Sequence, residues 1–166
     1  AIAMQVKLTE GDQARVRHMT DNLEAWSLAV KAHNLFETYT KDKNAKAREM
    51  FQKAVQLDPS YVYAWTYLGW TYYIDGLYYS DIYERDERFE RAVNMAQRAL
   101  SINDKSSDAN ALLSAVYLSQ KKYDDAVAVG KKTIELDPNS SENHAIVAIT
   151  MQNLGDFETA IMLVSA

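Results

Sequence analysis

The 166-residue sequence contains no cysteine, two prolines and only five glycines. Without cysteine the chain forms neither disulfides nor thiolate metal sites, so the sequence does not indicate whether the protein lies in an oxidising or a reducing compartment. So few turn-forming residues argue against a β-sandwich, which needs many tight turns. No apolar run reaches the roughly 18 residues that indicate a membrane-spanning helix. With 25% charged and 48% hydrophobic residues, the composition is typical of a folded domain with a sizeable core.

Positive charge is scarce as well. The 18 Lys and Arg residues are outnumbered by 23 Asp and Glu, which leaves a net charge of −5. Because binding to a phosphate backbone requires an excess of cations, we expect no nucleic-acid partner. His18, His33 and His144 have no second ligand at helical spacing, so no metal site is predicted. No phosphate-binding glycine loop, nucleophile elbow or carboxylate pair is present, so we predict no cofactor, no catalytic residue and no enzymatic activity.

The two ends of the sequence predict a piece of a longer protein. The first residues, AIAMQVKLTEGD, lack an initiator Met and the layout of a signal peptide. The last, GDFETAIMLVSA, stop within an apolar helical pattern. We expect residues 1–22 to be a helical segment leaving a preceding domain and residues 23–166 to form a second domain.

An internal repeat organises that second domain. The phrases AVQLDPS (54–60), ALSINDK (99–105) and TIELDPN (133–139) are variants of one pattern. The last two start 34 residues apart, and the first two start 45 apart, which is 34 plus an insertion of 11. The predicted units are 23–60, 61–106, 107–140 and a truncated 141–166. The predicted helices are 23–40, 45–57, 61–76, 86–102, 107–120, 123–136, 141–154 and 157–165. Either Asp21 or Asn22 can cap the first helix.

The motif residues resemble those of the tetratricopeptide repeat (TPR) family. The spacing W-x2-L-G-x2-Y and its companion A-x3-F…P are supplied by Trp65, Leu68, Gly69, Tyr72, Ala47, Phe51 and Pro59. The resemblance implies an all-α fold, a helix-hairpin solenoid wound as a right-handed superhelix of about four repeats. Small residues would let the helices approach closely, and larger ones would fill the gaps between them. The small set is Gly69, Ala92, Ala126 and Ala160, and the filling set is Phe51, Tyr123 and Phe157.

The second unit departs from the family pattern through its 11 extra residues at 77–87. Such an insertion exceeds an ordinary connection between paired helices, and long loops are often functional. We therefore expect a loop of unknown role there, followed by a solvated helix start with the ion pairs Glu84–Arg88 and Glu87–Arg91.

Aromatic residues crowd the helix predicted at 61–76. At about 100° per residue, Trp65, Leu68 and Tyr72 share the stripe that the repeat assigns to packing. A second stripe, centred roughly 150° away, contains Tyr63, Thr66, Trp70 and Tyr73. One core cannot receive both faces, so the helix is either buried all round or presents a contact surface. The insertion or the N-terminal segment could also fold over the second stripe and turn it into core.

The TPR resemblance implies that the first helix of each unit lines the concave side of the superhelix. Carried over by position, this predicts a groove that binds a protein segment or helix. The candidate groove residues are Lys31, Asn34, Tyr63, Thr66, Trp70, Tyr73, Ala111, Ala115, Leu118 and Ile149. One TPR subgroup binds chaperone C-terminal carboxylates through a cluster of Lys, Arg and Asn. The corresponding residues here are Ser27, Lys31, Tyr67, Asp108 and Leu112, so that clamp is absent.

A narrower resemblance concerns the parent protein. Residues 1–36 and 47–73 are similar to the C-terminal region of bacterial class III adenylate/guanylate cyclase-like proteins, in which a cyclase domain, a TolB-like segment and TPR units follow one another. This implies a cytoplasmic, regulatory scaffold that binds a partner or its own upstream domain, although a periplasmic location stays open. The alternative is a self-association domain, because Ile161, Met162, Leu163 and Val164 lack the polar capping helix that solenoids need.

Overall fold

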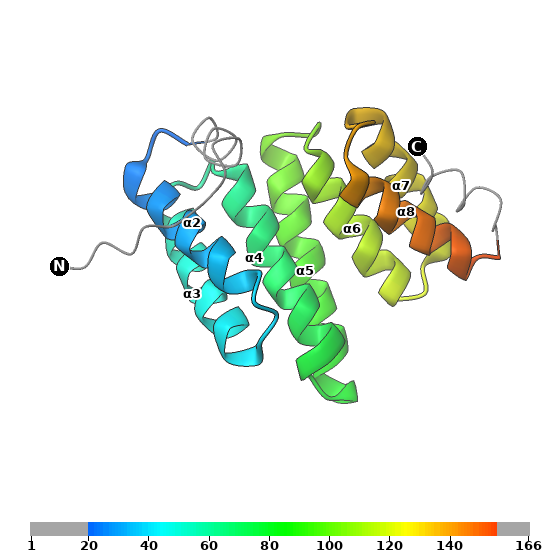
Figure 1. Cartoon of the computed structure of the whole chain (residues 1–166), viewed down its shortest axis with the longest axis horizontal. Coiled ribbons are helices and arrows are strands. Elements are labelled where there is room, and N and C mark those ends of the chain that lie inside the picture. The colour runs from blue at the N-terminus through cyan, green and yellow to red at the C-terminus, as the bar shows by residue number, and fades with distance from the viewer. Residues whose placement is uncertain (1–19, 156–166) are drawn as a thin grey trace.

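The computed structural model describes residues 20–155, all of whose regular elements are helical. Figure 1 shows antiparallel helix hairpins standing side by side in a row. This arrangement confirms the predicted all-α helix-hairpin solenoid. The elements are α2 (Leu23–Phe36), α3 (Lys41–Leu57), α4 (Val62–Ile74), the π-helix η1 (Asp75–Tyr79), α5 (Ile82–Ile102), α6 (Ser107–Ser119), α7 (Tyr123–Leu136) and α8 (Ser141–Asn153).

The first helices of successive units pack against one another as well as against their own partners. Thus α2 contacts α4, α4 contacts α6, and α6 contacts α8, while α3, α5 and α7 complete the hairpins. One hydrophobic core runs through α2 to α6, and a smaller cluster lies between α7 and α8, centred on Val147 and Met151 of α8. Each hairpin therefore buries its apolar face only by stacking on its neighbours.

Of the two predicted caps of the first helix, Asp21 and Asn22, the N-cap of α2 is Asn22. Its side-chain oxygen accepts from the backbone N–H groups of Glu24 and Ala25, and its amide donates to the carbonyl of Leu57 at 3.1 Å. Asn22 thus satisfies the open end of α2 and ties it to the end of α3.

Close helix approach depends on Gly69. A methyl group added there would stand 2.4 Å from Leu112 Cδ2 and 3.1 Å from Met95 Cβ, so α4, α5 and α6 meet where a side chain is missing. Phe51 is fully buried, as a gap-filling residue should be. The same prediction is wrong for Tyr123, which is 37% exposed because it is the first residue of α7. Ala160 and Phe157 lie outside the described residues.

The predicted loop at 77–87 is also wrong. The chain continues from α4 directly into η1, and α5 begins at Ile82, so only Ser80 and Asp81 connect the two helices. Asp81 is the N-cap of α5, because its carboxylate accepts hydrogen bonds from the backbone N–H groups of Tyr83 and Glu84. The inserted residues lengthen both helices of the hairpin instead of forming a loop.

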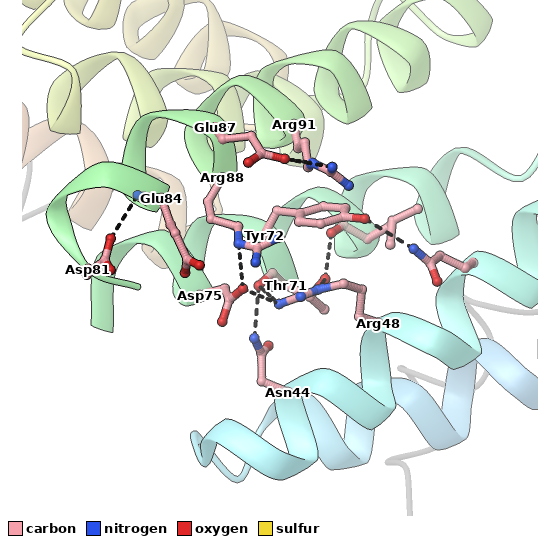
Figure 2. A network of polar contacts seen from close by, with 12 residues as sticks. Asn44, Arg48, Thr71, Tyr72, Asp75, Asp81, Glu84, Glu87, Arg88 and Arg91 are labelled. Carbon is pink, nitrogen blue, oxygen red and sulfur yellow. Dashed lines mark hydrogen bonds and ion pairs between the residues drawn. The ribbon is translucent and has the colours of Figure 1, made fainter. Parts of the chain in front are cut away.

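A polar network fixes the base of this extension, as Figure 2 shows. Asp75 Oδ2 lies 3.0 Å from Arg48 Nη2 and 3.0 Å from Arg88 Nε. The second contact is an ion pair and not an aligned hydrogen bond, since Arg88 Nε lacks hydrogen-bond geometry. Arg48 and Asn44 also donate to the carbonyl of Thr71. Arg88 therefore pairs with Asp75 and not with Glu84 as predicted.

The second predicted pair is present. Arg91 Nη2 donates to Glu87 Oε1 at 2.7 Å, on the exposed side of α5.

Candidate protein-binding groove

The predicted groove residues fall into three classes of exposure. Lys31 is exposed, and Ile149 is 51% exposed. The half-buried ones are Asn34, Tyr63, Trp70, Tyr73 and Leu118. The buried ones are Thr66, Ala111 and Ala115. The buried side chains offer no surface to a partner.

Thr66 illustrates how a predicted groove residue can be inaccessible to a partner. The side chain is 1% exposed, and its hydroxyl donates to the carbonyl of Val62 within the same helix. Asn34 is partly closed as well, because its amide donates to the carbonyl of Val30. The Thr66 hydroxyl is therefore satisfied inside the domain, whereas Asn34 keeps its amide oxygen and a second N–H for other contacts.

The N-terminal half of α4 forms an aromatic cluster with α2. The hydroxyl of Tyr63 is hydrogen-bonded to His33 Nδ1 at 2.9 Å. The rings of Tyr63 and Tyr67 lie 4.4 Å apart, and that of His33 lies 4.8 Å from Tyr67. Burial raises the pKa of Tyr63 well above its ordinary value, and the charge of Asp108 acts in the same direction. The hydroxyl therefore stays protonated and holds α4 against α2.

The sequence alone did not indicate that His33 belongs to this region, and it placed Tyr67 only at a position of the chaperone clamp. The sequence suggests only an ordinary surface or packing role for His33, because its partner lies 30 residues away. A four-residue spacing does place Tyr63 and Tyr67 on one side of the helix, which was the available signal.

The C-terminal half of α4 contains the second aromatic stripe. The rings of Trp70 and Tyr73 meet edge to face at 5.4 Å, and Tyr73 lies 5.9 Å from Phe89 of α5. A hydrogen bond of 3.2 Å joins the hydroxyls of Tyr73 and Ser119, the last residue of α6. Burial raises the pKa of Tyr73, and this hydrogen bond partly offsets the rise. Both aromatic side chains are anchored on one side and still partly exposed on the other.

Two kinds of site are not found in the part of the chain that the structure describes. Within residues 20–155 no cluster of three or more His, Cys, Asp or Glu side chains could hold a metal ion. Over the same residues, no helix has the length and apolar character needed to cross a lipid bilayer.

Family models agree with the helix-hairpin architecture. Two models, both described as tetratricopeptide repeat, match residues 50–93 and 85–150. The chain contains a TPR domain. The comparison with curated protein sequences finds no match.

Solved TPR structures share this fold at low sequence identity. TTC0263, a thermophilic TPR protein of Thermus thermophilus, is 17% identical, covering 91% of this chain and 75% of its own, with a TM-score of 0.78. The first TPR domain of Spaghetti (RPAP3), bound to the HSP90 peptide SRMEEVD, is 20% identical over 82% and 98%, with a TM-score of 0.63. The Sgt2 TPR domain of Aspergillus fumigatus is 17% identical over 84% and 85%, with a TM-score of 0.64.

Proposed function

We propose that this TPR domain is a protein-interaction scaffold that holds a peptide or helix of a partner, or a neighbouring domain of its own protein, against the layer of first helices. The observation that supports the proposal is the pair Trp70 and Tyr73. Both rings are packed against neighbouring side chains and are still partly exposed, as aromatic anchors of binding surfaces are. By the repeat register, Leu118 and Ile149 extend the same face with apolar surface.

The chemistry of this face favours apolar and aromatic contacts over capture of a terminal carboxylate. Among the positions of the chaperone clamp, Lys31 is the one cation, Asp108 contributes negative charge, and Leu112 is buried. A TPR domain of the same fold holds the HSP90 peptide SRMEEVD, which supports peptide binding by this architecture. The partner we propose here is a different one, an apolar segment or helix, because Asp108 would repel a carboxylate.

Replacing Trp70 and Tyr73 with Ala tests this function. The tagged double variant should lose the partners that the unaltered chain retains from an extract of the source cell, while far-UV circular dichroism shows unchanged helicity. Tyr123→Ala, which removes an exposed tyrosine at the start of α7, is the matched control and should retain every partner. An unchanged set of partners with the double variant would refute the groove.

We propose further that the domain regulates a cyclase-like signalling protein in the cytoplasm and has no catalytic activity itself. The support is the resemblance of residues 1–36 and 47–73 to the region that follows such cyclase domains. Reading the coding sequence upstream of residue 1 tests the link, since a cyclase domain would show its metal-binding carboxylates there. An activity screen of the isolated chain tests the absence of catalysis.

Self-association is the second candidate function. The residues on which it was first based, 161–164, lie outside the described part of the chain. Ile149 and Leu154 near the end of that part are 51% and 42% exposed, which supports an apolar surface there. Sedimentation velocity over a range of concentrations decides the matter, because a monomer at high concentration excludes this function.

A further inference from the structure

A second exposed surface lies away from the groove, at the end of the extended hairpin. In Figure 1 the π-helix and the start of α5 project beyond the ends of the neighbouring hairpins. This projection exposes large side chains that a soluble domain normally covers. We call the following set the aromatic tip: Tyr39 (59% exposed), Tyr78 (66%), Ile82 (72%), Tyr83 (91%) and the half-buried Tyr79, which contacts Tyr39 and Tyr78.

The aromatic tip is held in place from two sides. The hydroxyl of Tyr79 donates to the carbonyl of Tyr39 at 2.7 Å, which links η1 to the turn between α2 and α3. Tyr39 adopts a positive φ of 50°, and its ring lies 6.0 Å from buried Phe36. At the base, Asp75 is fixed by its ion pairs with two arginines. The rings of Tyr39, Tyr78 and Tyr79 are therefore presented on a supported surface, which is how binding sites limit the entropy lost on association.

The charge next to Tyr78, Ile82 and Tyr83 is negative, whereas the exposed Lys41 and Lys43 follow Tyr39 in the sequence. Within residues 81–86, three carboxylates face one guanidinium, that of Arg85. Glu84 and Asp86 are exposed and make no ion pair with another described residue. Phenol rings attract cations through their π faces, and neighbouring carboxylates strengthen the preference for arginine and lysine.

The same charge disfavours two other occupants. Two copies meeting tip to tip would bring their carboxylates together, in a chain whose net charge is already −5. An anionic membrane surface would repel the tip for the same reason. A cationic protein segment is the occupant that satisfies both the rings and the carboxylates.

We propose that the aromatic tip is a second docking surface, which binds an arginine- or lysine-rich segment of a partner protein. This site is separate from the groove around Trp70, because four of its five residues lie in the 11-residue insertion and the fifth, Tyr39, lies in the turn between α2 and α3. A partner could therefore occupy both surfaces at once.

Fluorescence anisotropy with a labelled peptide of alternating arginine and glycine tests the proposal. The unaltered chain should bind this peptide and not the matching peptide of alternating glutamate and glycine. The double variant Tyr78→Ser/Tyr83→Ser should lose about tenfold in affinity, since it removes two cation–π partners. Glu84→Gln/Asp86→Asn should weaken binding and reduce its dependence on salt.

Two control variants distinguish binding at the aromatic tip from non-specific binding of the arginine peptide and from binding at the groove. Tyr123→Ser removes an exposed tyrosine elsewhere and should bind the arginine peptide as the unaltered chain does. Trp70→Ala/Tyr73→Ala should also keep peptide binding, so the groove can fail while the tip stands, and the reverse. No binding of the arginine peptide, or equal affinity of the Tyr78→Ser/Tyr83→Ser variant, overturns the proposal. A dimer that this same variant abolishes would overturn it too, in favour of a second copy.

Discussion

The carboxylate of Asp75 lies 3.0 Å from the guanidinium of Arg48, so an ion pair joins the π-helix to α3 across the space between two repeats. Arg88 approaches the same carboxylate oxygen from α5. The three side chains are only 13%, 15% and 25% exposed. One buried negative charge therefore serves two cations, and its loss leaves both without their ionic partner.

Asp75→Asn should destabilise the domain strongly while keeping the shape of the side chain. We expect the free energy of unfolding to fall by about 3 kcal/mol, the size of effect seen when one member of a buried ion pair is removed. Urea denaturation followed by circular dichroism measures the change. Glu87→Gln breaks the exposed pair with Arg91 and should cost about 0.5 kcal/mol or less. Equal losses in the two variants would contradict a special role for Asp75.

Gly69→Ala should also destabilise, although alanine favours helices over glycine. The added methyl group would stand 2.4 Å from Leu112 Cδ2, which forces α4 and α6 apart or Leu112 into another rotamer. We expect a net loss of about 1–3 kcal/mol from overpacking, measured by urea denaturation.

Because the clash is with one side chain, Leu112→Ala should relieve it. A double-mutant cycle with Gly69→Ala should therefore show a smaller loss for the pair than the sum of the single losses. Simple addition would show that Leu112 does not set the distance between α4 and α6.

Asn22→Ala should weaken the start of α2. The substitution removes an N-cap and the hydrogen bond to Leu57, so we expect a loss of about 1–2 kcal/mol. Asp21→Ala, one residue earlier and exposed, should change stability little. Thermal unfolding of the two variants makes the comparison, and a reversed order would assign the cap to Asp21.

Asp58 should make stability depend on pH. Burial opposes ionisation, but hydrogen bonds from Ser60 and Thr20 outweigh it and lower the pKa of Asp58 below its ordinary value of 3.8. Because the folded pKa is depressed, the contribution is present above the unfolded pKa and is lost as pH falls through the folded value. NMR titration of the carboxyl group should give the lowered pKa, and Thr20→Val should return it part of the way. A pKa at or above the ordinary value would contradict this account.

The helix hairpins could be predicted from the sequence because the repeat motif fixes which residues within each unit pack between its helices. The motif requires a small residue at position 69 and a large one at position 51. In the structure, Gly69 lies where a side chain would clash, and Phe51 is fully buried. The insertion was harder to interpret, since its 11 residues amount to about three helical turns and fit within the hairpin. Asp81 followed three residues later by Glu84 is typical of a helix start and could have indicated the result.

The exposure of individual groove positions could not be predicted from the repeat register. The register places Thr66 and Ala111 on the first-helix layer, but how closely α4, α6 and α8 approach depends on the side chains between them. Their close packing buries both residues. The arginines that meet at Asp75 come from helices on either side of α4, so their convergence was hidden in the sequence.

The π-helix bears on how an array of TPR repeats can change during evolution. The extra residues lengthen one hairpin along its own axis, and the hairpins before and after it still pack against it through the contacts of α3 with α4 and of α5 with α6. A lineage can thus acquire a protruding element in a single repeat without rebuilding the others. Length is free to vary at the ends of the helices, where no neighbour has to move.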